Sequence, residues 1–273
     1  MGLFSNKVAI ITGSASGIGR ALAEELAGLG ANLILADINI AAAEKVAESL
    51  TKSSSKAKAV KLDVSDFKAV KKLVEDTVVE HGRLDYMFNN AGIAVGGSAV
   101  DFVYEDWTNV INTNLYGVVN GVAAAYPIMA KQGFGHIVNT ASLAGLIPAP
   151  GEISYTASKY GIVGLSNALR IEGAGLGVKV SVVCPGFIDT PIYHTNKVVN
   201  LDREKALENL PKNLTSAIDC AKVILRGVAR NKATIVVTLH AKLFYLLQRI
   251  SPALIFALGK HYIKLWGDAR IKK

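Results

Sequence analysis

The sequence has few cysteines, and its histidines do not have the spacing of a metal site. Two of the 273 residues are cysteine, Cys184 and Cys220, and two thiols cannot build a disulfide framework. The closest pair of histidines, His240 and His261, stands far outside the spacing of zinc ligands. We therefore expect no metal site and no zinc-dependent mechanism.

The sequence also lacks the long apolar runs of secretory and membrane-spanning segments. Its first apolar run, residues 8–11, leads straight into a glycine-rich motif and leaves no room for the apolar region of a signal peptide. Residues 243–266 are rich in Leu, Ile and Phe, but Arg249 and Pro252 interrupt them, so no apolar run reaches about 18 residues. We expect a cytoplasmic protein without a transmembrane helix.

Acidic residues are almost absent from the last part of the chain. Residues 220–273 contain 11 Lys and Arg but a single acid, Asp268, whereas the formal net charge of the whole chain is +8. The basic character therefore belongs to the tail. Because its cations alternate with Leu, Ile and Phe, the tail favours contact with a membrane over contact with nucleic acid, and we expect no nucleic-acid partner.

Short apolar runs recur between helical stretches and predict a parallel sheet. Several of these runs are apolar on both faces, as expected for strands covered by helices on both sides. Lys52 to Lys58, a Ser/Lys stretch, is interpreted as an exposed connection before the third strand. The pattern indicates one doubly wound α/β domain of the Rossmann type. The seven predicted strands are Val8–Ile11, Leu33–Ala36, Ala59–Leu62, Leu84–Phe88, His136–Thr140, Val178–Val183 and Thr234–Thr238.

Three glycines follow the first predicted strand and open a helix. Gly13, Gly17 and Gly19 are spaced Gly-x-x-x-Gly-x-Gly, and without a Cβ they let the backbone turn tightly and approach a pyrophosphate. The unpaired amides and the dipole at the helix N-terminus stabilise the charge of such a group. The motif predicts a dinucleotide site.

This spacing resembles that of the short-chain dehydrogenase/reductase family, and further motifs follow in the family's order along residues 5–238. The resemblance implies a strand order of 3-2-1-4-5-6-7, a cofactor-binding catalytic domain over residues 1–239 and an apolar, basic extension of it over residues 240–273. The family's other cofactor motifs match Asp63-Val64, Asn89-Asn90-Ala91-Gly92, Pro185-Gly186 and Thr190. The cofactor-binding positions that the resemblance implies are Gly13, Ser16, Gly17, Ile18, Gly19, Asp37, Asp63, Val64, Asn90, Ala91, Gly92, Tyr155, Lys159, Pro185, Gly186, Ile188 and Thr190.

Asp37, at the end of the second predicted strand, favours NAD over NADP. A carboxylate there accepts hydrogen bonds from the adenosine ribose and repels a 2′-phosphate. Two alternatives stay open at this point: Asp37 could instead cap the next helix, and Arg20 is close enough in sequence to supply a cation for a 2′-phosphate.

Tyr155 and Lys159 stand at i and i+4, so on a helix they share one face. An ammonium beside a phenol favours the phenolate and is expected to lower the pKa of Tyr155. A second such pair, Tyr193 and Lys197, is interpreted as a decoy, with Tyr193 in a loop over the substrate. The resemblance implies that Tyr155 transfers the proton, Ser142 stabilises the substrate oxygen, Lys159 binds the nicotinamide ribose and Asn114 completes a proton relay.

The sequence thus predicts an oxidoreductase that moves a hydride between NAD(H) and a hydrophobic secondary alcohol or ketone, steroid-like or lipid-like, working as a homodimer or homotetramer. The alternative is a non-catalytic NAD-binding sensor or scaffold. The tail either packs as extra helices, on the domain or at a subunit interface, or lies in a membrane interface, where Arg249, Lys260 and Lys264 meet anionic lipid.

Overall fold

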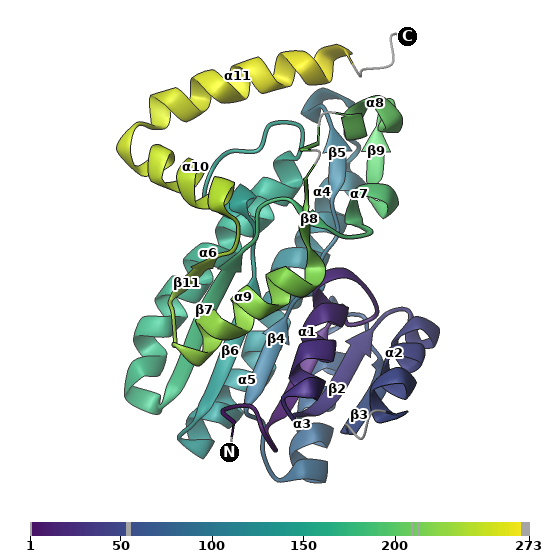
Figure 1. The fold of residues 1–273 in the computed structure, drawn as a ribbon, viewed down its shortest axis with the longest axis vertical. Helices are drawn as coiled ribbons and strands as arrows, with labels where there is room; N and C mark the ends of the chain where they lie inside the picture. The colour runs from purple at the N-terminus through teal and green to yellow at the C-terminus, as the bar shows by residue number, and fades with distance from the viewer. Residues whose placement is uncertain (1, 53–55, 209, 212, 269–273) are drawn as a thin grey trace.

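The computed structural model describes residues 2–52, 56–208, 210–211 and 213–268. Its centre is a parallel sheet of seven strands in the order β11-β7-β6-β4-β1-β2-β3 (Figure 1). Counting only these strands along the chain, this is the predicted order 3-2-1-4-5-6-7, and the Rossmann-type fold is confirmed. The strands are β1 (Val8–Thr12), β2 (Asn32–Asp37), β3 (Lys56–Lys61), β4 (Tyr86–Asn89), β6 (Gly135–Thr140), β7 (Val178–Cys184) and β11 (Thr234–Val236).

The middle strands are buried on both faces, which explains their continuous apolar sequence. All five residues of β1 are buried, and Ile10 and Ile11 point to opposite sides of the sheet into two different core clusters. The edge strand β3 differs, because it pairs only with β2 and alternates Lys with Ala and Val. The interpretation of Lys56 to Lys58 as a connection was therefore wrong; residues 53–55 lie outside the described part.

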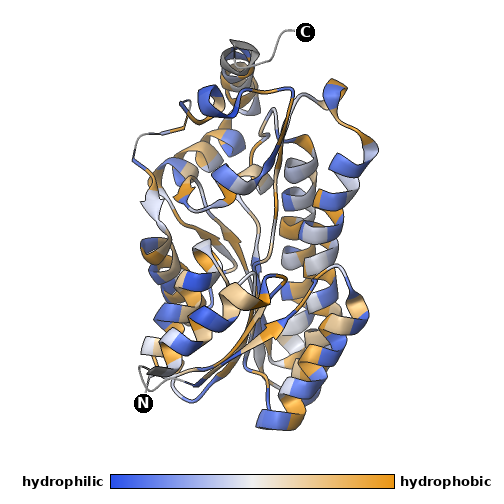
Figure 2. Ribbon diagram, turned by 90° about the vertical axis from the view of Figure 1, so that its right-hand side faces the viewer, coloured by the Kyte–Doolittle hydropathy of each residue, from blue (hydrophilic) through white to orange (hydrophobic). Residues whose placement is uncertain are grey.

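Helices cover both faces of the sheet, and hydrophobic residues follow the central strands between them (Figure 2). One face packs against α1 (Gly17–Gly28), α2 (Ile40–Lys52) and α9 (Ala217–Ala229). The other packs against α3 (Phe67–His81), α5 (Gly117–Gln132) and α6 (Ile153–Gly173). Both ends of α3 are set by local contacts: the Asp66 carboxylate accepts from the amides of Lys68 and Ala69, and Gly82 ends the helix at φ 72°.

Most of the shorter elements gather at the carboxyl ends of the strands. They are β5 (Val95–Gly97), η1 (Ala99–Asp101), α4 (Tyr104–Val110), the π-helix η2 (Ile111–Tyr116), η3 (Leu143–Gly145), η4 (Ala174–Leu176), β8 (Ile188–Asp189), α7 (Ile192–Thr195), β9 (Lys197–Val199), α8 (Arg203–Glu208) and β10 (Thr215–Ser216). Of these, η4 instead precedes β7, and the others border the end of the sheet at which open α/β folds bind ligands.

The tail forms two helices that lie across this end of the molecule (Figure 1). They are α10 (Leu239–Ile250) and α11 (Pro252–Asp268), separated by Ser251. Among their described hydrophobic side chains, Ala241 and Ile255 are buried in the domain. Within the described residues, none of the helices combines the length and the apolarity that crossing a bilayer requires.

Candidate active site

A cleft of about 850 Å³ opens at the carboxyl end of the sheet. Its walls come from the segments after β1, β2, β3, β4, β6 and β7, together with α7. Every predicted site residue except Gly19 and Asn114 lines it. The fold thus brings into one cleft residues that lie far apart in the sequence, and its volume is within the range typical of ligand sites.

The glycine turn has the conformation that its sequence predicts. Gly13 and Gly17 have φ of 65° and 52°, in the left-handed region that favours glycine. Gly19 does not line the cleft and acts indirectly, because a Cβ at this position would lie 2.0 Å from the carbonyl oxygen of Gly13. Only glycine lets α1 start this close to the turn.

Asp37 links the loop after β1 to the loop after β2. Its two carboxylate oxygens accept from the amides of Ala15 and Asn39, each at 2.9 Å. The alternative that Asp37 caps α2 is not what the structure has, because the side chain of Asn39 accepts from the amide of Ala42 and caps that helix. The Arg20 guanidinium pairs with Glu24 at 2.8 Å on the exposed side of α1.

Asn90 joins the ends of three strands below the cleft. Its side-chain amide donates to the carbonyl oxygen of Thr12 at 3.1 Å, its backbone amide donates to the Thr12 hydroxyl at 2.9 Å, and its side-chain oxygen accepts from Thr140 at 3.3 Å. This segment therefore steadies the sheet where β1, β4 and β6 end. At the next wall of the cleft, Asp63 is held by hydrogen bonds from the amide and hydroxyl of Ser65.

Ser142 and Tyr155 meet in the cleft. Ser142 follows β6 and precedes η3, while Tyr155 lies in the first turn of α6; both line the cleft, and the Ser142 hydroxyl acts on the phenol to lower its pKa. The Ser142 Oγ also accepts from the amide of Ala144 at 3.1 Å, which fixes its orientation. Two oxygens that can donate a proton are thus side by side, as two groups that converge on one substrate oxygen must be.

Lys159 is buried one helical turn further along α6, with its ammonium 5.3 Å from the centre of the Tyr155 ring. It donates to the carbonyl oxygen of Thr140 at 2.8 Å, and burial lowers its pKa to about 8. The expected net lowering of the Tyr155 pKa was wrong for this structure. Burial raises that pKa and Glu152 raises it further, whereas the hydrogen bond from Ser142 lowers it.

Asn114 lies beside the cleft, in the π-helix between α4 and α5. Its side-chain oxygen accepts from the amide of Ile93 at 2.8 Å, and its amide donates to the Ile93 carbonyl at 2.9 Å and to Ser158 at 3.1 Å. A π-turn widens a helix locally and is frequent at functional sites. Asn114 and Lys159 lie on the same side of Gly92, because a Cβ there would be 3.2 Å from the Asn114 oxygen and 3.6 Å from the Lys159 nitrogen.

Tyr193 and Lys197 do not form a second Tyr–Lys pair. Tyr193 belongs to α7 and lines the cleft, and burial raises its pKa to about 12. Lys197 belongs to β9 and forms an ion pair with the buried carboxylate of Asp106. The two residues therefore do not share a helix face, and the expectation that Tyr193 lies in a loop was wrong, because it belongs to the short helix α7.

Two residues next to this cleft are not predicted from the sequence. Glu152 is half-buried near Tyr155 and Tyr193, and desolvation raises the pKa of its carboxyl to about 7. Glu152 is the residue directly before α6, three positions from Tyr155, and this closeness in sequence could have pointed to it. His240 comes from α10 and touches the Gly186–Phe187 segment, and no local pattern in the sequence signals this contact.

Comparisons with known proteins agree with this geometry. A sequence model of the family described as short chain dehydrogenase matches residues 7–198. A putative oxidoreductase, SadH, of Mycobacterium tuberculosis is 38% identical over 255 residues, 92% of either chain. Cyclohexanol dehydrogenase of an Acinetobacter species is 40% identical over 190 residues, 69% of this chain and 76% of that one. A short chain dehydrogenase/reductase from Burkholderia phymatum, solved in complex with NAD, superimposes with a TM-score of 0.86 at 31% identity, covering 93% of this chain and 96% of the other.

Proposed function

The chain belongs to the short-chain dehydrogenase family of oxidoreductases, and from this membership we propose that it moves a hydride between NAD(H) and a hydrophobic secondary alcohol or ketone. One observation carries the proposal: Tyr155 and Ser142 line the same cleft that the glycine turn borders. Acid–base chemistry and dinucleotide binding therefore share one site.

The four catalytic residues have separate tasks in this proposal. Bound NAD(H) supplies or accepts the hydride. Tyr155 gives a proton to the substrate oxygen in reduction and takes it back in oxidation, and Ser142 donates a hydrogen bond to the same oxygen. Lys159 gives one N–H to Thr140 and can give its others to ribose hydroxyls. Asn114 holds the backbone of Ile93 in place beside Lys159 and so completes the proton path.

The cleft fits a dinucleotide at the end where the glycines lie. The left-handed turn at Gly13 and Gly17 puts backbone amides and the start of α1 beside the cleft, where they would hold a pyrophosphate. Asp37, Asp63 and Val64 would hold the adenosine part, and Asn90, Ala91, Gly92, Pro185, Gly186, Ile188 and Thr190 the nicotinamide part. NAD is favoured over NADP, because Asp37 supplies a negative charge at the adenosine end and Arg20 is paired with Glu24.

The hydrophobic nature of the substrate is inferred from what borders the cleft. Gly259 of α11 lies next to Pro150, since a Cβ there would be 3.9 Å from the Pro150 ring, and Tyr262 acts electrostatically on Tyr193. The apolar extension therefore lies at the substrate end of the site, which favours steroid-like or lipid-like alcohols. The similarity to cyclohexanol dehydrogenase supports a secondary alcohol as the reacting group.

The proposal is tested with the purified full-length protein and a series of alcohols and ketones, from short-chain to steroidal, each with NAD(H) and NADP(H). We expect reduced-nicotinamide absorbance to rise with NAD and a hydrophobic secondary alcohol, with kcat/KM increasing as the alcohol becomes more apolar. Tight NADH binding without turnover of any alcohol or ketone would instead identify a cofactor sensor or scaffold.

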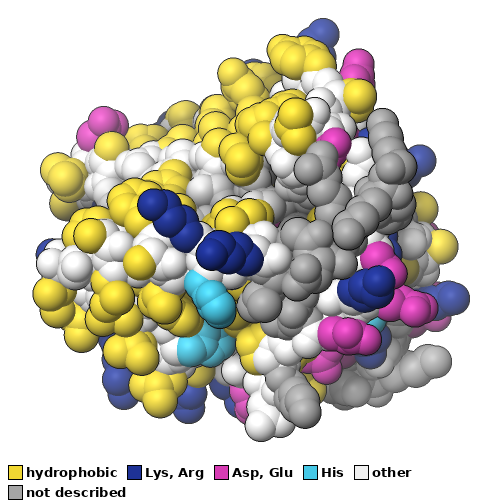
Figure 3. Space-filling model, turned by 90° about the horizontal axis from the view of Figure 1, so that it is seen from above, with side chains coloured by type: hydrophobic (Ala, Val, Ile, Leu, Met, Phe, Trp, Pro, Cys, Tyr) yellow, Lys and Arg dark blue, Asp and Glu magenta, His cyan; other side chains and the backbone are white. Residues whose placement is uncertain are grey.

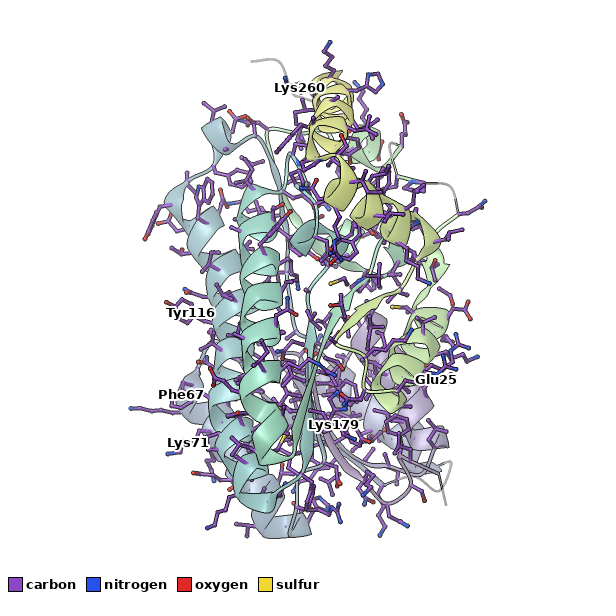
Figure 4. The ribbon with its side chains drawn as sticks, turned by 90° about the vertical axis from the view of Figure 1, so that its left-hand side faces the viewer. Glu25, Phe67, Lys71, Tyr116, Lys179 and Lys260 are labelled. Carbon is purple, nitrogen blue, oxygen red and sulfur yellow. The ribbon has the colours of Figure 1, made fainter. Side chains whose placement is uncertain are left out.

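The assembly and location of the protein are further parts of this proposal. We divide it into a catalytic domain over residues 1–239 and an extension over 240–273, and we place it in the cytoplasm with peripheral membrane contact through that extension. For the proposed homodimer or homotetramer, η2 packs against α6, and these helices expose Tyr116 by 55% (labelled in Figure 4) and Tyr160 by 42%. Mass measurement by light scattering determines the subunit number.

A further inference from the structure

Helix α10 exposes a continuous apolar stripe. Leu239, Leu243, Leu246 and Ile250 follow one another at i, i+4, i+7 and i+11 and therefore share one face of the helix. Their exposed fractions are 82%, 54%, 54% and 72%. Helices of soluble proteins turn such a stripe toward the core, but here it faces away from the domain.

Helix α11 continues the apolar surface. Ile255, Gly259 and Tyr262 lie on the inner side, toward the domain, while Leu254, Phe256, Leu258 and Ile263 are exposed by 40% or more. Eight large apolar side chains are thus exposed on two consecutive helices. Scattered single apolar residues are normal on a surface, but four on one face of α10, with four more on the next helix, mark an interaction site.

The cations lie on the same two helices. Lys242 and Arg249 flank the stripe on α10, and Lys260 and Lys264 are exposed on the outer side of α11. No acidic residue occurs in the sequence from 220 to 267. Viewed from this end, the molecule shows hydrophobic side chains grouped over the extension with Lys and Arg among them (Figure 3).

An exposed apolar stripe with cations beside it favours one of three possible partners, which are nucleic acid, a second copy of the chain and an anionic bilayer. Nucleic acid would neutralise the cations but would leave the leucines in water. A second copy of the chain, related by a twofold axis, would set this basic surface against itself and bring like charges together. An anionic bilayer takes up the apolar stripe at its headgroup boundary and attracts the cations with its phosphates.

We propose that the outer face of α10 and α11 docks on an anionic lipid surface, with Leu239, Leu243, Leu246 and Ile250 inserted and Lys242 and Arg249 against the headgroups. This docking specifies which surface makes the peripheral membrane contact proposed above, through which chemistry and in which orientation. It therefore rests on that earlier proposal of membrane contact. Since the inner side of the same helices borders Pro150 and Tyr193, docking places the substrate end of the cleft next to the bilayer. A hydrophobic alcohol could then enter from the lipid.

The test is co-sedimentation of the full-length protein with vesicles, without substrate. Vesicles of phosphatidylcholine and phosphatidylglycerol are compared with vesicles of phosphatidylcholine alone. We expect binding to the anionic vesicles that weakens as salt is raised.

The double variant Leu243→Glu/Leu246→Glu should lose this binding, whereas Val79→Glu, at an 87% exposed site on α3, should keep it. Lys242→Glu/Arg249→Glu should bind at least about tenfold more weakly, and Lys68→Glu on α3 about as well as the native protein.

Two results would overturn the proposal. The first is that the stripe variants sediment with vesicles as well as the native protein does. The second is that the native protein does not bind vesicles while the stripe variants have a smaller oligomer mass than the native protein. That second result would mean that the stripe contacts a second copy of the chain. Turnover of a water-soluble alcohol without vesicles checks that each variant is folded. It also separates failure of lipid docking from failure of the proposed reaction, because docking is measured without substrate.

Discussion

The imidazole of His240 accepts a hydrogen bond from the backbone amide of Phe187, with 3.2 Å between Nε2 and N. The two rings also pack together, with 5.4 Å between their centres. A Cβ on Gly186 would lie 2.2 Å from the same Nε2, so the glycine is required for this approach. His240 therefore connects α10 to the segment after β7 that borders the cleft. Nε2 can accept only while the ring is neutral, and burial lowers the pKa of His240, which keeps it neutral.

Replacing His240 should loosen this wall of the cleft. His240→Leu leaves the Phe187 amide without an acceptor, at a cost of about 1–3 kcal/mol, and we expect the KM for NAD to rise by roughly 5- to 150-fold. His240→Gln offers an amide oxygen to the same N–H and should restore most of the affinity. His261→Gln, at an exposed histidine of α11, is the matched control. Steady-state kinetics of the three variants measures the effect, and equal KM values for the His240→Leu and His240→Gln proteins would contradict it.

Tyr155→Phe should separate proton transfer from cofactor binding. The change removes the hydroxyl that shares the cleft with Ser142 and leaves the ring beside Lys159 in place. We expect kcat to fall by about 10²- to 10⁴-fold, the usual contribution of a positioned proton donor, with NADH affinity nearly unchanged. Stopped assays and a fluorescence titration with NADH measure the two quantities. A comparable loss of NADH affinity would mean that the phenol serves mainly to hold the cofactor.

Glu152→Gln should move the pH dependence of the reaction. Above about pH 7 the carboxyl is ionised, and its charge raises the pKa of the Tyr155 phenol, because it disfavours a second negative charge nearby. Removing that charge lowers the phenol pKa, so the rising limb of kcat/KM for alcohol oxidation should shift to lower pH. Asp189→Asn is the control, since Asp189 acts on Tyr193. An unshifted profile would show that Glu152 does not reach the phenol during turnover.

Asp37→Asn should relax the discrimination between NAD and NADP. One oxygen remains to accept a backbone amide of the loop, while the negative charge that repels a 2′-phosphate is lost. Like charges opposed at an interface cost several kcal/mol, so we expect the ratio of kcat/KM for NAD over NADP to drop by about tenfold or more. The ratio is measured with one alcohol and both cofactors. If it stays constant, the preference comes from another part of the adenosine site.

Two glycines on α1 provide a test of the turn. A Cβ at Gly19 would lie 2.0 Å from the Gly13 oxygen, whereas nothing lies within 4 Å of one at Gly28. Gly19→Ala should abolish NAD binding and destabilise the fold. Gly28→Ala should leave NAD binding intact and raise stability by up to about 1 kcal/mol through helix propensity. Urea unfolding and an NAD titration check both, and normal NAD binding by the Gly19→Ala protein would refute the steric argument.

The sequence alone determined the sheet and the local motifs. Runs such as residues 8–11 predict buried strands, because an apolar residue on every face fits only a strand covered on both sides. The glycine turn and the Tyr155–Lys159 spacing are equally local, since φ angles and i,i+4 neighbours depend on nearby residues. Of the site residues predicted from the sequence, all but Gly19 and Asn114 line the cleft.

Only the tertiary structure decided the direction of the Tyr155 pKa shift, the contact of His240 with Phe187 and the outward orientation of the α10 stripe. Each depends on which side chains other parts of the chain bring close. A helical pattern shows that Leu239 and Leu243 share a face, but whether the domain, a second copy or a bilayer covers that face depends on packing. Burial likewise has the largest effect on the pKa of Tyr155, because desolvation is set by the whole fold and not by spacing along one helix.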